Sequence, residues 1–148
     1  MSNASNFLVL FLSLQCEQTQ DNKGCTTVGV CGKDAETASL QDLQLHFNIG
    51  LGQWAQAIES KGGKVSEDVK DLLLDSTFAT LTNVNFDSSR FYSYLQRAND
   101  IRTKLSAQAK SLGVDVDSLK GPAQFQYNVR ICTHESVRYF SMINSLHE

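Results

Sequence analysis

The chain has 148 residues, 41% of them hydrophobic, and this size and composition predict one globular domain with a substantial core. Its 13 basic residues are outnumbered by 16 acidic ones, for a formal net charge of −3, and no basic block occurs. We therefore expect neither a nucleic-acid partner nor a membrane partner, because both are usually held by concentrated positive charge.

A short apolar run at residues 7–12 precedes the first cysteine. No basic residue stands before it and no small-residue cleavage site follows cleanly, so it fits neither a signal peptide nor a membrane span. We expect a short buried strand or the start of a helix there. Clustered thiols without a secretory signal are typical of metal ligands in a reducing compartment, so the predicted location is cytoplasmic.

Three of the four cysteines lie within residues 13–42, at the spacing Cys16-x8-Cys25-x5-Cys31. Glycines and polar turn residues separate them, which predicts a compact loop that directs several sulfurs at one point. Thiolates at this density suit zinc or an iron–sulfur cluster. The spacing matches neither the ferredoxin patterns nor the short cysteine pairs of zinc ribbons, so it leaves the metal open. The fourth cysteine, Cys132, is too remote in sequence to be assigned to this loop.

Three later segments carry apolar residues at helical spacing. The first covers residues 39–60 and stops at a pair of glycines. The second begins near Ser66, which can cap it, and the third covers residues 91–112 and stops at Gly113. With no convincing strand alternation, these segments predict an all-α helical bundle with the cysteine-rich loop at one end.

Several residues in these segments have both a functional and a structural interpretation. His46 and Trp54 suggest a ligand and an electron relay, but we favour a surface histidine and a core tryptophan. The Asn and Asp residues of 83–87 resemble the opening of a calcium loop, yet the loop's turn glycine and bidentate glutamate are missing from the sequence. We expect these side chains to satisfy backbone groups and cap the following helix.

The last part of the chain reads as a polar connector over residues 114–130, followed by a short helix over residues 134–147. The sequence contains no nucleophile elbow and no Gly-rich phosphate motif, so hydrolase chemistry has no support. It gives no indication of an oligomeric state.

The cysteine-rich segment resembles the amino-terminal signature of the hybrid-cluster proteins, also called hydroxylamine reductases or prismane proteins. The similarity lies in QCEQT, GC, GVCGKDAET and LQDL, in this order, and in a second block, TLTNVNFD at residues 80–87 followed by Arg90. It covers roughly residues 14–112. It divides the chain into a divergent N-terminal extension, 1–12, an iron–sulfur helical domain, 13–113, and a divergent C-terminal tail, 114–148.

In that family, four cysteines at the spacing Cys-x2-Cys-x8-Cys-x5-Cys hold an iron–sulfur cubane. The resemblance therefore implies that Cys16, Cys25 and Cys31 are cluster ligands and that Ser13 stands at the first ligand position. A 4Fe–4S or 3Fe–4S cluster is the implied cofactor. The implied function is electron transfer in a hydroxylamine reductase-like oxidoreductase, with a redox partner protein as a further expectation.

The family's catalytic hybrid cluster is ligated by residues of later domains, so the resemblance implies no hybrid cluster in this chain. We accordingly expect that the chain alone does not reduce hydroxylamine. The alternative is a helical remnant or interaction module that binds zinc through the same thiols or binds no metal. The serine at the first ligand position favours this alternative.

Overall fold

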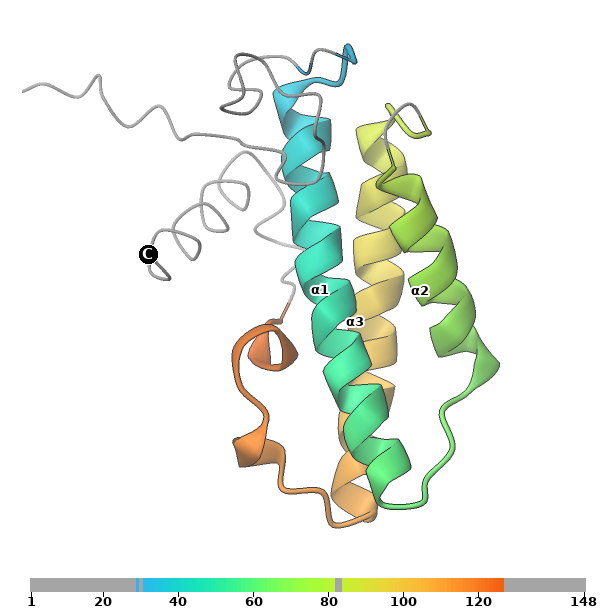
Figure 1. The fold of residues 1–148 in the computed structure, drawn as a ribbon, viewed down its shortest axis with the longest axis vertical. Helices are drawn as coiled ribbons and strands as arrows, with labels where there is room; N and C mark the ends of the chain where they lie inside the picture. Colours follow the sequence, from blue (N-terminus) through green and yellow to red (C-terminus); the bar gives the residue numbers. More distant parts are fainter. Residues whose placement is uncertain (1–28, 30, 82–83, 127–148) are drawn as a thin grey trace, which may run out of the picture.

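The computed structural model describes residues 29, 31–81 and 84–126 (Figure 1). These residues form three α-helices and two short 3-10 helices: α1 (Ala35–Ser60), α2 (Glu67–Ala79), α3 (Ser88–Ser111), η2 (Val116–Ser118) and η3 (Gly121–Gln124). No β-strand occurs within these ranges. The prediction of an all-α bundle is confirmed.

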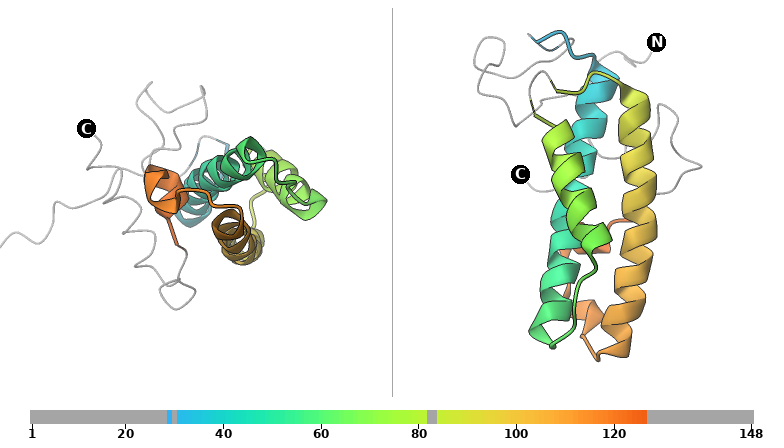
Figure 2. Two further views of the ribbon diagram at one scale, coloured as in Figure 1. Left: turned by 90° about the horizontal axis from the view of Figure 1, so that it is seen from below. Right: turned by 90° about the vertical axis from the view of Figure 1, so that its right-hand side faces the viewer.

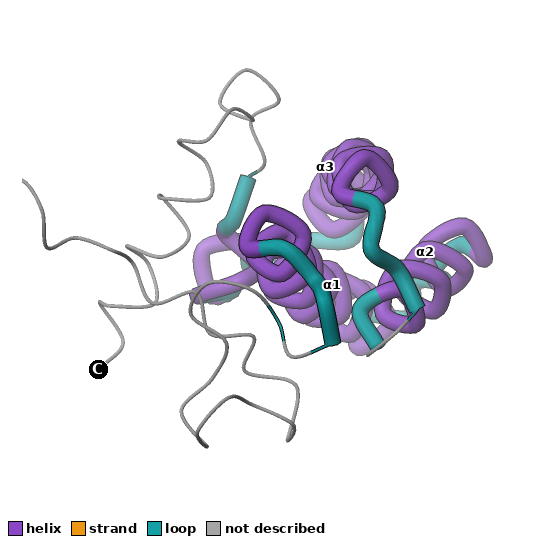
Figure 3. The backbone as a smooth tube through the Cα atoms, turned by 90° about the horizontal axis from the view of Figure 1, so that it is seen from above, coloured by secondary structure: helices purple, strands orange, loops and turns teal. Residues whose placement is uncertain are grey.

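The three α-helices pack side by side with alternating direction along the chain (Figures 1 and 2). Viewed down their axes they form a triangle, in which α1 packs mainly against α3 and α2 lies beside both (Figure 3). As a result, the start of α1, the end of α2 and the start of α3 meet at one end of the bundle. We call this the cysteine end, because Cys31 precedes α1 there.

The core of the bundle is formed by the apolar face that the helical spacing predicts. In α1 this face consists of residues that are at most 3% exposed: Leu40, Leu43, Phe47, Leu51, Trp54 and Ile58. The matching face of α3 consists of Phe91, Leu95, Ala98, Ile101, Leu105 and Ala109. Burial of these faces against each other supplies the main stabilisation of the fold, because the hydrophobic effect scales with apolar area removed from water.

The helix starts follow local capping chemistry. α1 begins at Ala35, about one turn earlier than predicted, because the Asp34 side chain accepts a hydrogen bond from the Thr37 amide at 2.7 Å. Ser66 occupies the N-cap position of α2 as predicted, but its side chain makes no capping hydrogen bond. At α3 the capping prediction is confirmed, since Asp87 accepts from the Ser89 amide at 2.9 Å.

Residues 114–126 belong to the segment predicted as a polar connector, and they fold back along α1. The Trp54 indole N–H donates to the Ala123 carbonyl at 2.9 Å, and the Ala123 amide donates to the Gln53 side chain at 2.9 Å. Trp54 is thus a core residue, as predicted. His46 is half-buried rather than a surface residue, with its ring edge-on to Phe125 at 5.5 Å between centroids.

Within the part of the chain that the structure describes, no helix is both long and apolar enough to cross a membrane. The short apolar run at residues 7–12 and the predicted helix at residues 134–147 lie outside the described residues.

Candidate metal site

Cys31 is the one predicted ligand that lies among the described residues; Ser13, Cys16 and Cys25 lie outside them. It is exposed and forms no disulfide with another described residue. Two backbone hydrogen bonds close a tight turn around it. The Gly32 amide donates to the Gly29 carbonyl at 2.7 Å, and the Gly29 amide donates to the Lys33 carbonyl at 2.7 Å.

Glycine is favoured on both sides of this cysteine for different reasons. Gly32 has a φ of +90°, a conformation that other residues rarely adopt. A Cβ atom at Gly29 would lie only 3.0 Å from the Cys31 sulfur and 3.2 Å from the Lys33 carbonyl oxygen. The turn therefore packs closely around Cys31 on the Gly29 side while the cysteine stays exposed, which fits a cysteine that ligates a group outside the helical bundle.

The bundle does not form a metal site by itself. Within residues 29, 31–81 and 84–126, no three His, Cys, Asp or Glu side chains are grouped closely enough to hold a metal ion. What the bundle supplies is a fixed position for one thiol, because Cys31 is joined by a hydrogen-bonded turn to the capped start of α1.

Lys33, two residues after Cys31, is a feature that sequence reasoning missed. It is only 5% exposed, its ammonium donates to the Gln41 side-chain oxygen at 2.6 Å, and it lies 5.5 Å from the centre of the Phe86 ring. A buried charge is costly unless polar or aromatic groups compensate it. Lys33 therefore ties the cysteine turn both to α1 and to the segment between α2 and α3. The only sign of this anchoring role in the sequence is that a lysine directly follows Cys31 and Gly32.

A buried polar network joins α1 to α2 in the half of the bundle that includes the cysteine end. The Gln44 amide donates to the Asn48 side-chain oxygen at 2.8 Å, and the Asn48 amide donates to the hydroxyls of Ser76 at 2.9 Å and Thr77 at 3.0 Å. Ser76 in turn donates to the Leu72 carbonyl at 2.6 Å. Such networks favour one register between two helices, because a shift leaves buried polar atoms unpaired.

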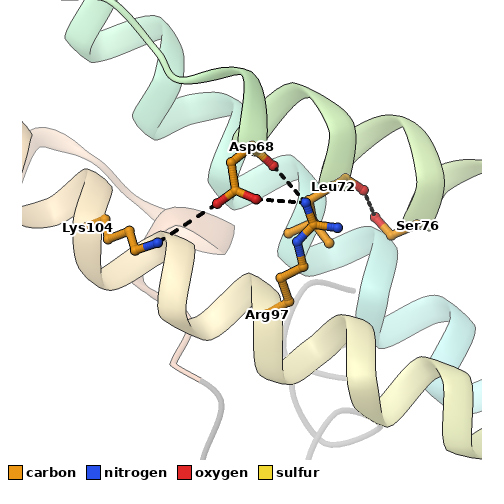
Figure 4. Close-up of polar contacts among 5 residues, drawn as sticks. All are labelled: Asp68, Leu72, Ser76, Arg97 and Lys104. Atoms are coloured by element: carbon orange, nitrogen blue, oxygen red, sulfur yellow. Dashed lines mark hydrogen bonds and ion pairs between the residues drawn. The ribbon is translucent and has the colours of Figure 1, made fainter.

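The start of α2, at the end of the bundle opposite the cysteine end, carries a cluster of surface ion pairs (Figure 4). Arg97 on α3 donates to the Asp68 carboxylate at 2.7 Å and to the Asp68 carbonyl at 3.3 Å, while Lys104 lies 3.9 Å from the same carboxylate. The hydrogen bond from Arg97 lowers the pKa of Asp68 below its ordinary value. These groups are exposed, and they connect two helices far from Cys31.

The bundle and the turn at its end define an all-α domain that carries a cysteine-rich segment before its first helix. The model of the Prismane/CO dehydrogenase family matches residues 14–138, and the chain belongs to this family. The match includes all three clustered cysteines and begins one residue after Ser13. It also extends past Gly113 into the predicted divergent tail, whose boundary stays a prediction.

Curated relatives support the same assignment. The chain is 41% identical over 113 residues to a hydroxylamine reductase of Methanocella arvoryzae, covering 76% of this chain and 20% of that protein. It is 43% identical over 112 residues to the hydroxylamine reductase of Syntrophobacter fumaroxidans, and this alignment covers 75% of this chain and 20% of that protein. It is 49% identical over 73 residues to the hydroxylamine reductase of Desulfovibrio desulfuricans, and this alignment covers 49% of this chain and 13% of that protein. The chain thus spans about a fifth or less of the length of these relatives, and the resemblance seen in the sequence is confirmed.

Proposed function

We propose that this chain is the N-terminal iron–sulfur domain of a hydroxylamine reductase-like oxidoreductase, serving electron transfer to a hybrid cluster held by other domains. The observation that carries the proposal is the family match, which runs through all three clustered cysteines. A redox partner protein and a cytoplasmic location belong to the same proposal, because thiolate ligands need a reducing compartment.

Cys16, Cys25 and Cys31 are the proposed ligands, with Ser13 at the fourth position. A cluster bound there would supply one-electron storage at a potential set by its charge, its hydrogen bonds and its exposure to solvent. The contribution of the described residues is to orient one ligand. The turn around Cys31 fixes its backbone, Gly29 permits the close approach of the turn to its sulfur, and Lys33 anchors the turn to the bundle.

Ser13 makes one corner of the proposed cluster weak. A serine hydroxyl holds its proton far more tightly than a thiol, so it is a poor anionic ligand at neutral pH. Three thiolates then favour a 3Fe–4S cluster, or a 4Fe–4S cluster whose fourth iron binds serine, water or an added thiol. The same substitution favours the second candidate function, a helical remnant or interaction module that binds zinc or no metal.

Anaerobic reconstitution with iron and sulfide tests the proposal. The wild-type chain should develop broad charge-transfer absorbance, Cys25→Ala should abolish it, and Cys132→Ala should leave it unchanged as a matched control. Ser13→Cys should raise the iron bound per chain and slow the loss of absorbance in air. Equal iron and identical spectra for Ser13→Cys and wild type would remove Ser13 from the ligand set, and a wild-type chain without charge-transfer absorbance would refute the cluster.

A further inference from the structure

Exposed large apolar side chains are concentrated in one region, the second half of α2 and the segment that follows it. Five residues form this region, which we call the α2 apolar patch. They are, with their exposed fractions, Leu74 (71%), Phe78 (59%), Leu81 (49%), Val84 (41%) and Phe86 (46%). Among the described residues, only Ile49 and Leu112 are further large apolar side chains of comparable exposure, and both belong to other helices or helix ends.

The spacing and hydrogen bonding of these residues make them neighbours. Leu74, Phe78 and Leu81 follow each other at steps of four and three, so they lie along one side of the helix and its continuation. The Val84 amide donates to the Leu81 carbonyl at 3.3 Å, which holds the next apolar residue against the end of this row. The patch exposes on the order of 400 Å² of largely apolar area, the size of the largest patch on a typical monomer.

The patch borders the cysteine end of the bundle. α2 ends there, beside the start of α1 (Figure 1). Phe86 belongs to the patch, and its ring lies 5.5 Å from the ammonium of Lys33, two residues from Cys31. The first turns of α2, at the other end, instead carry an exposed ion pair between Lys70 and Glu67 at 2.6 Å. The apolar character is thus confined to the half of α2 that lies next to the candidate cluster ligand.

We infer that the α2 apolar patch is the face on which the catalytic part of a hydroxylamine reductase-type chain docks. This inference rests on the proposed function, because it names the partner of the same site. In the curated relatives the aligned region is about one fifth of the chain, so the remainder is about four times as long. Under the proposed function, that remainder must lie close to this domain to receive electrons. The patch would supply roughly half of the 800 Å² that each side of a standard interface buries.

The chemistry of the patch favours a permanent neighbour over a transient electron carrier. Weak redox encounters use small interfaces, whereas obligate interfaces are apolar like a domain core cut in half. None of the five patch residues is charged. A second copy of this chain is the other apolar occupant that such a face can accept, and the experiment below separates the two.

Binding can be measured by calorimetry with the 148-residue chain and the Syntrophobacter fumaroxidans hydroxylamine reductase from which the aligned N-terminal region has been removed. The wild-type chain should bind with one-to-one stoichiometry. Leu74→Ser combined with Phe78→Ser should weaken binding at least tenfold, because it removes the two most exposed apolar anchors. Ile49→Ser is the matched control, because Ile49 is 57% exposed on α1, and it should change affinity less than twofold.

Unchanged affinity of the double variant would overturn the inference, as would a wild-type chain that self-associates through the patch and ignores the truncated relative. If the truncated relative does not fold, the chain is fused in place of its missing region. Amide exchange across residues 74–81 should then be at least tenfold slower than in the isolated chain, and equal exchange rates would also overturn the inference.

The same experiment separates this inference from the proposed function. The Cys25→Ala chain, which lacks a proposed ligand but keeps the patch, should bind as tightly as wild type. An iron-loaded chain that does not bind would refute the docking face alone. A chain that binds through the patch but carries only zinc would refute the proposed function alone.

Discussion

Replacing Gly50 by alanine tests how the region after α3 is held against the first helix. A Cβ atom at Gly50 would lie 2.4 Å from the Pro122 carbonyl oxygen and 2.7 Å from its carbon. These are backbone atoms in a segment fixed by Trp54, so they cannot move aside as a flexible side chain would. Overpacking of this kind costs about 1–3 kcal/mol and often more for a backbone clash.

Gly52 provides a matched control, because it lies two residues further along α1 and a Cβ there meets no atom within 4 Å. Gly52→Ala should therefore stabilise the protein by about 0.5–1 kcal/mol, the usual gain from alanine inside a helix. Gly50→Ala receives the same gain but loses more to the clash, so we expect a net destabilisation of about 1–2 kcal/mol.

Urea denaturation followed by circular dichroism measures both variants under the same conditions. The difference between them should be about 2 kcal/mol, which corresponds to a separation of roughly 5–10 °C in melting temperature for a domain of this size. Equal stability of Gly50→Ala and Gly52→Ala would show that residues 121–124 do not pack on α1 in solution.

Three further predictions follow from other contacts. Asn48→Ala should cost about 2 kcal/mol in urea denaturation, because it leaves the buried Gln44 side-chain amide without its acceptor and removes the hydrogen bonds to Ser76 and Thr77; a loss below about 0.5 kcal/mol would contradict the network. Because Arg97 lowers the pKa of Asp68, the pair stabilises the fold above the ordinary carboxyl pKa, and this stabilisation is lost as the pH falls through the lowered value. Asp68→Asn should thus be less stable than wild type at neutral pH, and its stability should decline less steeply between about pH 5 and pH 2 until the two proteins are equal at the lowest pH. Parallel curves of stability against pH for the two proteins would contradict this. Lys33→Met should lower the reduction potential of the reconstituted cluster on the order of tens of mV, by removing a buried positive charge near Cys31. Potentiometric titration measures it, with an exposed lysine at the other end of α1, Lys61→Met, as the control that should not shift.

The sequence predicted the helices well because burial and local spacing coincide there. The row from Leu40 to Ile58 is apolar at every third or fourth position, and the structure buries each member. The start of α1 was misplaced because its cap, Asp34, lies inside the segment that the cysteines dominate. Its Asp-x-x-Thr spacing nevertheless contains the capping signal.

Features that depend on contacts between distant segments were not predictable in the same way. Residues 114–126 have no periodic pattern, and their packing depends on a close backbone approach at Gly50. The burial of Lys33 depends on Phe86, more than fifty positions away, whereas a lysine in a polar segment normally lies in solvent. For the cluster site, the family resemblance assigned ligands that spacing left open, and the structure describes only Cys31 among them.

The identity of the metal tests the central claim most directly. Protein purified without exposure to oxygen should contain three to four iron atoms per chain with a matching amount of acid-labile sulfide, and it should give an electron paramagnetic resonance signal of a 3Fe–4S or 4Fe–4S cluster in one of its redox states. Cys25→Ala should contain almost none of this iron. Stoichiometric zinc without sulfide in the wild-type protein would contradict the account and would assign the three thiols to a zinc site instead.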